Sequence, residues 1–338
     1  MNKISKFSKE LTQVFNLRTE IINNDKSFLG KVLKINKIYT NGPKRKTCII
    51  CNNILTKTDF ISHNVPYTFC KKCNHLNGKY LITDRFNEYV FIKSGSKKIT
   101  KQYSNNFNSR VRKIYKPKID FLKSVIKKKF SLLDIGCGAG HLIKSCELLK
   151  INAIGVDPNL KLIKLGKKYI KKNELICMNF SKCLDEIVTT PCNVISLMFV
   201  LEHLKDPNDV FLKFKKSKAE YIYISVPLFS LAVMFETSFQ NNYPRVLGGL
   251  HTNLYSKESL KFIAKKYNLE VVGEWWFGSD FFDLYSKLIN NSKKNSLFYK
   301  EKINNFFKLG INKLQENVDK MKYCSEVHII FKKNEKKN

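Results

Sequence analysis

Two cysteine pairs have the spacing of a metal site. Cys48 and Cys51 stand in "CIICNN", Cys70 and Cys73 stand in "FCKKCNH", and eighteen residues separate the two pairs. A Cys-x2-Cys turn presents two thiolates together, and two such turns complete the tetrahedron that Zn²⁺ prefers. We expect one structural zinc here, because protein ligands would fill all four positions and leave none open for chemistry.

The alternatives for these cysteines are less favoured. A redox Cys-x-x-Cys motif would be expected in a strand–helix–strand unit, and here there are two copies outside any such unit. Chance proximity of core cysteines is the other alternative, and His63 and His75 lie close enough in the sequence to replace a thiolate. The remaining six cysteines are scattered, and in a reducing compartment we expect them to be small buried hydrophobic residues.

A second stretch has the composition of a ligand-binding loop. In "LLDIGCGAGHL", residues 132–142, an apolar run ends at Asp134 and is followed by Gly136, Gly138 and Gly140. Glycines packed this closely after a strand let the backbone approach a ligand. A Walker loop would need a Lys-Ser/Thr pair, and a dinucleotide fingerprint has the spacing G-x-G-x-x-G. Neither pattern is present, so the loop favours a ligand without a pyrophosphate.

Two carboxylates flank this loop. Asp134 stands two residues before the first glycine, where it can face a cationic group, and Asp157 ends the next apolar run, "AIGVD". A carboxylate at that tip can accept both hydroxyls of a ribose, and about 20 residues between it and the glycines fit a strand–helix–strand crossover. S-adenosylmethionine has an amino group, a sulfonium and a ribose but no phosphate. We therefore expect it to bind at the carboxyl ends of the strands.

Three segments, "LLDIGCGAGHL", "AIGVDP" and "VISLMFVLEHLKDP", make residues 130–275 resemble class I S-adenosylmethionine-dependent methyltransferases. The third is similar to the segment after the fourth strand in methyltransferases of quinones and sugars. The resemblance implies that Asp134 and the glycines hold the methionine end and that Asp157 holds the ribose. It places Asn179 beside the adenine, where many members have an acidic residue. The cofactor contacts that it further implies are Cys137, Pro158, Phe180 and Phe199.

Alternating apolar and helical segments from residue 130 predict the architecture. Runs such as "CNVISLMFV" and "AEYIYISVP" are apolar throughout, which is typical of strands buried on both faces of a parallel sheet. We expect an α/β fold with a Rossmann-like, seven-stranded, mostly parallel sheet, preceded by a small zinc-ribbon module. The expected units are a loosely packed or irregular N-terminal arm (1–46), the zinc ribbon (47–92), a helical connector (93–129) and the methyltransferase domain (130–334), with a substrate insertion at 228–255 and a helical excursion at 279–320.

Three residues are candidates for catalysis. His203 follows the fourth expected strand, where the methyl group should lie, and an ordinary histidine pKa of about 6.5 suits a general base. The alternative is that Glu202 or His203 braces the next helix. His251 lies in the long insertion and can face the substrate, although "HTNLYSKESL" also fits the start of a helix. Tyr103 is placed over the cofactor by the family layout.

The charge of the chain bears on its partners. The formal net charge is +33, but only six of the 61 basic residues are arginine, the residue best suited to phosphates and guanine edges. Abundant Lys, Asn and Ile suggest a compositional bias, and an anionic acceptor such as a nucleotide-linked sugar would also suit the charge. The turn after the fourth strand lacks the Asn/Asp-Pro-Pro-aromatic pattern of nucleobase-amine methylases. A basic surface nevertheless leaves an RNA methyltransferase as an alternative.

The whole layout resembles certain bacterial sugar C-methyltransferases and related enzymes of surface-polysaccharide clusters, in which a zinc ribbon precedes the catalytic domain. It implies C- or O-methylation of a small molecule, with a non-catalytic scaffold as a further alternative. We find no apolar run of the ~20 residues that cross a bilayer and no secretion signal, and we expect a cytoplasmic protein.

Overall fold

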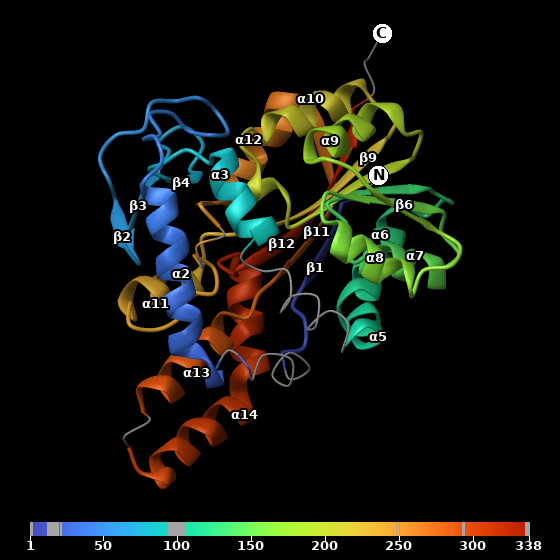
Figure 1. Cartoon of the computed structure of the whole chain (residues 1–338). Helices are drawn as coiled ribbons and strands as arrows, with labels where there is room; N and C mark the ends of the chain where they lie inside the picture. Colours follow the sequence, from blue (N-terminus) through green and yellow to red (C-terminus); the bar gives the residue numbers. More distant parts are fainter. Residues whose placement is uncertain are drawn as a thin grey trace.

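The computed structural model describes residues 3–11, 20, 22–93, 106–247, 249, 251–292 and 295–334 (Figure 1). Its centre is an eight-stranded sheet with the order β1-β11-β12-β9-β8-β5-β6-β7. All neighbours run parallel except β12, which is antiparallel to both β11 and β9. The strands are β1 (Ile4–Phe7), β5 (Leu132–Ile135), β6 (Ala153–Asp157), β7 (Glu174–Cys177), β8 (Val194–Met198), β9 (Tyr221–Pro227), β11 (Leu269–Phe277) and β12 (Glu326–Lys333).

Helices cover both faces of this sheet, as its apolar strands require. One face packs against α6 (Lys116–Val125), α7 (His141–Leu148) and α8 (Leu160–Lys167). The other face packs against α9 (Phe180–Thr189), α10 (Asn208–Lys216) and α12 (Lys257–Tyr267). The short α5 (Phe107–Arg110) and the π-helical η2 (Val111–Tyr115) lead into α6, and the 3₁₀ helix η3 (Leu201–His203) follows β8. The seven strands and the α/β class expected from the sequence are confirmed.

An eighth strand corrects the expectation of an irregular N-terminal arm. β1 pairs in parallel with β11, from Ile4 opposite Gly273 to Phe7 opposite Trp276. The backbone of Ser8 continues this contact, since its carbonyl accepts a hydrogen bond of 2.9 Å from Nε1 of Trp275. An edge strand with unpaired backbone groups can pair with another chain and cause aggregation. Strand β1 pairs with the backbone groups that β11 would otherwise expose at this edge of the sheet.

The rest of the expected arm is also ordered where it is described. Helix α2 (Asp25–Thr40) lies beside a small four-stranded sheet, with Ile35 and Tyr39 in its core (Figure 1). The Tyr39 hydroxyl donates a 2.7 Å hydrogen bond to the carbonyl of Tyr80, and Asn36 Nδ2 donates to the carbonyl of His63 at the same distance. The lysine-rich composition hid this helix, because its buried positions are few and partly polar.

The small sheet, called the cysteine sheet below, adjoins the two turns that carry the four cysteines, and one of its strands comes from far along the chain. Its antiparallel order is β10-β4-β3-β2, with β2 (Phe60–Ser62), β3 (Val65–Phe69), β4 (Leu76–Gly78) and β10 (Asn253–Leu254). Strand β10 belongs to the expected substrate insertion, so the cysteine sheet and the large domain share a segment. After the sheet, α3 (Asp84–Asn87) and the π-helical η1 (Glu88–Lys93) lead toward the large domain.

The insertion and the helical excursion pack against each other. Helix α11 (Leu231–Ser238) opens the insertion, and α13 (Asp280–Asn291) and α14 (Leu297–Met321) form the excursion between β11 and β12. The Arg245 guanidinium donates two bonds of 2.8 and 2.7 Å to the Asp283 carboxylate, and Glu236 accepts from the amides of Val246 and Leu247. These buried polar contacts hold the insertion together and join it to α13.

Candidate active site

The glycine-rich loop has a backbone that side chains would disturb. Gly136, Gly138 and Gly140 have φ values of 73°, 56° and 72°, all in the left-handed region. A Cβ on Gly136 would lie 2.7 Å from Cγ2 of Val200, so this part of the loop is packed against the segment after β8. A Cβ on Gly138 would meet nothing closer than 3.9 Å, so the loop is open to a ligand at that point.

The two acidic residues predicted to flank the loop do so. Asp157 Oδ2 accepts a 2.8 Å hydrogen bond from the Gly138 amide, and Oδ1 accepts one of 2.7 Å from the Asn159 amide. Asp134 Oδ1 accepts a 2.6 Å bond from the Ser196 hydroxyl. Burial raises the pKa of Asp134 to about 7, and the bond from Ser196 opposes that rise. Burial also raises the pKa of Asp157, while the two amide bonds counteract it.

A buried lysine near this loop was not anticipated. Lys118 of α6 is 4% exposed, and its Nζ lies 5.2 Å from the ring centre of Phe199 and 3.8 Å from Oε1 of Glu326. His328 Nε2 lies 2.7 Å from the same Glu326 oxygen. Burial lowers the pKa of Lys118, and His328 and Lys118 hold the pKa of Glu326 down at about 2. A signal was present, because Lys118 falls on the apolar stripe that Ile119, Leu122 and Val125 continue.

The other predicted cofactor residues gather at the same edge of the sheet. Pro158 follows β6, and Phe180, which is partly buried, begins α9 after β7. Asn179 Oδ1 accepts from the Lys182 amide at 2.9 Å, so this side chain caps α9. The Cys137 side chain instead points into the core beside Gly155. Its backbone is paired within the protein, since its amide donates to the Val156 carbonyl at 3.1 Å and its carbonyl accepts from the Gly140 amide at 2.9 Å.

Phe199, directly after β8, has a strained backbone. Its φ of 57° is in the left-handed region, which is unusual for a bulky residue and is a feature of functional sites. Its amide donates to the Ser225 carbonyl at 3.0 Å and lies 3.1 Å from the Ser225 hydroxyl, which fixes this conformation. The half-buried ring is thereby held between β8 and the 3₁₀ helix that carries His203.

The structure brings two of the three predicted catalytic residues together. The rings of His203 and His251 stack with centres 5.3 Å apart, although 47 positions separate them in the chain. Between them lies Glu202, whose Oε1 is 3.7 Å from Nε2 of His203 and 3.9 Å from Nε2 of His251. Tyr103, the third predicted residue, lies outside the described residues.

The electrostatics of this group are set by burial. Glu202 is fully buried, and within the described part of the chain neither carboxylate oxygen has a hydrogen-bond partner. Burial raises the pKa of Glu202 to about 8 and lowers the pKa of His251 to about 4. The Nδ1–H of a neutral His251 donates to the Val246 carbonyl at 2.6 Å, so its unprotonated Nε2 faces Glu202. One ligand atom from each of the three residues lies within 4.8 Å of the others, a separation that would also admit a cation.

The four cysteines form the second cluster. Their Sγ atoms lie within 4.8 Å of one another, at 3.6 Å for Cys48 and Cys73 and 3.3 Å for Cys51 and Cys70. Sulfurs around a tetrahedral zinc with Zn–S bonds of about 2.3 Å would be about 3.8 Å apart, so the donor set and spacing fit Zn²⁺. His63 and His75 are not part of the cluster.

Both cysteine turns have the same backbone form. Asn52 follows Cys51 and Asn74 follows Cys73, and each asparagine has a φ of 58°. The amide of Asn52 donates to the Cys48 carbonyl at 3.0 Å, and the amide of Asn74 donates to Cys70 at 2.8 Å. Asparagine tolerates the left-handed region, so "CIICNN" and "FCKKCNH" are two copies of one turn.

A chain of buried hydrogen bonds joins the two clusters. Asn77 Nδ2 donates toward Cys48 Sγ at 3.6 Å and to the His75 carbonyl at 2.9 Å. His75 Nε2 lies 2.9 Å from Asn253 Oδ1, and Asn253 Nδ2 donates a 2.8 Å bond to the carbonyl of Glu202. Asn253 of β10 therefore connects the cysteine sheet to the 3₁₀ helix that carries Glu202 and His203.

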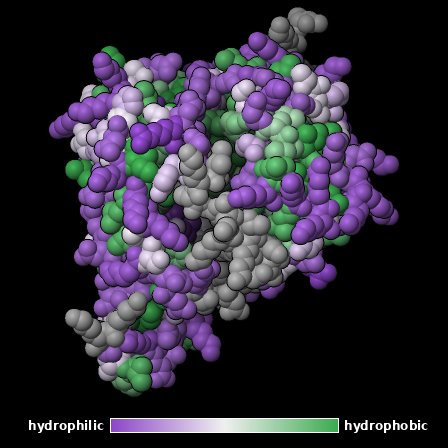
Figure 2. Space-filling model, viewed as in Figure 1, coloured by the Kyte–Doolittle hydropathy of each residue, from purple (hydrophilic) through white to green (hydrophobic). Residues whose placement is uncertain are grey.

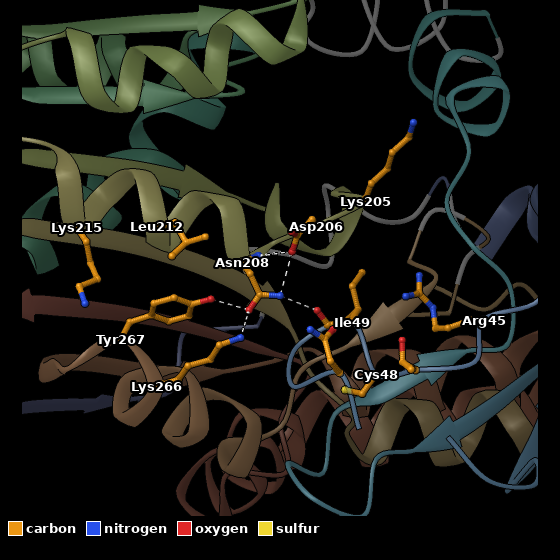
Figure 3. Close-up of a pocket in the computed structure, with 12 residues that line it drawn as sticks. Arg45, Cys48, Ile49, Lys205, Asp206, Asn208, Leu212, Lys215, Lys266 and Tyr267 are labelled. Atoms are coloured by element: carbon orange, nitrogen blue, oxygen red, sulfur yellow. Dashed lines mark hydrogen bonds between the residues drawn. The ribbon is translucent and has the colours of Figure 1, made fainter. Parts of the chain in front are cut away.

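A basic cleft of about 540 Å³ lies where the first cysteine turn meets α10 and α12. The side-chain amide of Asn208 forms three hydrogen bonds in this cleft (Figure 3). Its nitrogen donates to the Ile49 carbonyl, and its oxygen accepts from Lys266 Nζ and from the Tyr267 hydroxyl. The charged side chains that line the cleft are Arg45, Lys205, Lys215, Lys266 and Asp206. Lys205 also forms an ion pair with Asp84.

Comparison with known proteins agrees with this geometry. The family described as "Methyltransferase domain" matches residues 107–274, from α5 to β11. The chain carries a class I S-adenosylmethionine-dependent methyltransferase domain. The mitochondrial ubiquinone biosynthesis O-methyltransferase of Saccharomyces cerevisiae is 32% identical over 88 residues, which are 25% of this chain and 28% of the yeast protein.

Solved methyltransferase structures match with low identity. A SAM-dependent methyltransferase from Archaeoglobus fulgidus is 22% identical with a TM-score of 0.43, covering 68% of this chain and all of that one. The plantazolicin methyltransferase BamL, solved with S-adenosylhomocysteine, is 15% identical with a TM-score of 0.45, covering 74% and 95% of the two chains. No helix in the described part of this methyltransferase is both long and apolar enough to cross a membrane.

Proposed function

We propose that this methyltransferase transfers a methyl group to an oxygen or carbon atom of an anionic small molecule, with a sugar or nucleotide-linked sugar as the favoured acceptor. The observation that carries the proposal is the group of Glu202, His203 and His251 beside the loop of Gly136, Gly138 and Gly140. A cluster of two histidines and a carboxylate suits an acceptor that must lose a proton.

The cofactor would be held at the carboxyl edge of β5, β6 and β7. Asp134 and the glycines of the loop would hold the methionine end, Asp157 would accept the ribose hydroxyls, and the segment at Asn179 and Phe180 would face the adenine. The Asp157 carboxylate keeps acceptor capacity beyond its two amide bonds. S-adenosylmethionine supplies an electrophilic methyl carbon on its sulfonium.

In this proposal His203 removes the acceptor proton, at Nε2. S-adenosylmethionine would supply the methyl group to the acceptor atom and would leave as S-adenosylhomocysteine, while His203 would keep the proton that the acceptor loses. Glu202 Oε1 lies 3.7 Å from His203 Nε2, and burial raises the pKa of Glu202 to about 8, so its carboxyl group stabilises the imidazolium that the proton transfer produces only once it has ionised. His251 stacks on His203 and would fix the orientation of its ring and one wall of the acceptor site.

The charge of the chain supports an anionic acceptor. The formal net charge is +33, and four cationic side chains line the cleft beside the 3₁₀ helix against one carboxylate, Asp206. Lys205 stands two positions after His203, so the basic cleft begins next to the proposed base. Phosphate or carboxylate groups on the acceptor would be attracted there.

We also propose that the four cysteines bind one structural zinc. Four thiolates at tetrahedral spacing leave no open position, so the ion would hold the cysteine sheet together and take no part in methyl transfer. Through β10 the sheet would support the acceptor site.

The test is a methylation assay with purified protein, labelled S-adenosylmethionine and a panel of nucleotide sugars, sugar phosphates and their uncharged forms. The proposal expects turnover that His203→Asn lowers by at least about 10²-fold, the usual contribution of general acid–base catalysis. S-adenosylhomocysteine affinity should stay within about two-fold in that variant, because His203 lies outside the cofactor site. Turnover unaffected by His203→Asn, or a preference for the uncharged acceptors, would contradict it.

A further inference from the structure

The outward side of helix α14 carries large apolar side chains. Phe298, Phe306 and Leu309 are 66%, 60% and 89% exposed. The helix packs against the body with its opposite side, where the buried residues are Phe307, Ile311, Gln315 and Asp319. A helix on the surface of a globular enzyme ordinarily presents polar residues to water, and an apolar cluster of this kind marks an interaction surface.

Lysines are interleaved with these apolar residues. Phe298, Lys302, Phe306, Leu309 and Lys313 follow one another at intervals of four, four, three and four, which places them along one stripe of the helix. Lys302 Nζ lies 4.7 Å from the ring centre of Phe298, so charge and apolar surface adjoin. Residues 297–313 contain four lysines and one acidic residue, which gives the segment a net charge of 4 − 1 = +3.

The position of the segment favours a flat partner. The hairpin of α13 and α14 extends away from both sheets, with the N-terminal half of α14 at its far end (Figure 1). Green apolar surface lies among purple hydrophilic surface at this lower end of the molecule (Figure 2). A protruding end can reach a plane without a clash from the rest of the chain, whereas a groove would be needed to hold a peptide or a helix.

We infer that the outward face of α14, from Phe298 to Lys313, docks the enzyme on an anionic lipid bilayer. Phenylalanine and leucine side chains would enter the interface, and the lysines would contact the acidic headgroups. A second copy of the chain is the less favoured occupant, because pairing two such faces would bring like charges together in a protein with a net charge of +33. The inference does not depend on the acceptor proposed above.

The test is co-sedimentation of the full-length, metal-loaded protein with vesicles of phosphatidylcholine alone or with about 30 mol% phosphatidylglycerol. The wild-type protein should bind the anionic vesicles and not the neutral ones. Phe306→Ser and Leu309→Ser should each lower the partition coefficient by about ten-fold, because each removes one apolar side chain that enters the bilayer interface on binding. Lys302→Gln and Lys313→Gln should each weaken it by about five-fold and reduce its salt dependence.

Ile54→Ser is the matched control, since Ile54 is 75% exposed on the cysteine module, far along the chain from α14. Its binding to anionic vesicles should equal that of the wild type. Equal binding to both vesicle types, or an equal loss in Ile54→Ser, would overturn the inference. So would self-association in sedimentation velocity that Leu309→Ser abolishes, because the occupant would then be a second copy.

Discussion

Asn253 should control the reaction without touching the cofactor or the acceptor. Its side chain links His75 of the cysteine sheet to the carbonyl of Glu202, with bonds of 2.9 and 2.8 Å in a fully buried setting. The Asn253→Ala variant removes both bonds and leaves two buried polar groups without partners. Each unsatisfied group costs about 1–3 kcal/mol, so the free energy of unfolding should fall by about 2–6 kcal/mol.

The reaction rate should fall as well. The 3₁₀ helix that carries Glu202 and His203 would lose its link to the cysteine sheet, and a displacement of about 1 Å at a catalytic group can cost about 10²-fold in rate. We therefore expect kcat to fall by about 10- to 100-fold in Asn253→Ala, with the affinity for S-adenosylhomocysteine within about two-fold of the wild type.

The assay combines urea denaturation, calorimetric titration with S-adenosylhomocysteine, metal analysis and methyl transfer on the same preparations. Asn253→Asp keeps the oxygen that faces His75 but loses the donor to Glu202, so it should retain stability better than Asn253→Ala while losing a similar part of the rate. Asn305→Ala, an exposed position on α14, is the control and should change neither quantity. Wild-type kcat in a folded Asn253→Ala protein would refute the reasoning.

Three further perturbations have defined outcomes. Gly140→Ala places a Cβ 2.6 Å from Ile170 Cδ1 at a φ of 72°, and it should lower the free energy of unfolding in urea titrations by about 1–3 kcal/mol. Gly310→Ala in α14 is the matched control, because its Cβ would meet no atom closer than 3.7 Å, and it should raise the free energy of unfolding by about 0.5–1 kcal/mol. Glu202 keeps its proton to about pH 8 in the folded protein but only to about pH 4.5 in the unfolded protein, so the free energy of unfolding should fall as pH rises from 4.5 to 8. In thermal melts at pH 5 and pH 8, Glu202→Gln should remove this part of the fall. The same pH dependence in the variant and the wild type would contradict the prediction. Cys70→Ser should reduce bound zinc from one per chain and unfold the cysteine sheet, as read by metal analysis and proteolysis, and full zinc content in this variant would exclude the four-thiolate site.

Much of the large domain could be predicted because its signals are local. Mainly apolar segments predicted seven of the eight strands of the large sheet. The loop of Gly136 to Gly140 and the aspartates beside it follow directly from the chain order. The paired turns of the cysteine module were equally visible, since each is contained within a few residues. In both cases the residues that form the feature are neighbours in sequence.

The features that escaped prediction depend on contacts between distant segments. Strand β1 is four residues long and acquires its role only by pairing with β11, and β10 is two residues long and completes a sheet formed about 180 positions earlier. The sequence contains many surface lysines, and Lys118 was not distinguished from them. Its position on an apolar stripe of the helix was nevertheless visible in the sequence. The contact between His203 and His251 could not be predicted without knowing how the insertion folds. The buried hydrogen bonds of Arg245 and Glu236 determine that fold.

The central claim is that the edge of β5 and β6 binds the cofactor, and calorimetric titration with S-adenosylhomocysteine tests it most directly. The wild-type protein should bind one equivalent, and Asp157→Ala should abolish or strongly weaken binding, because it removes the proposed ribose acceptor and the carboxylate that holds the Gly138 amide. Asp185→Ala, which alters an aspartate whose side chain is 61% exposed on α9, should bind like the wild type. Binding that survives Asp157→Ala undiminished in a folded protein would contradict the account.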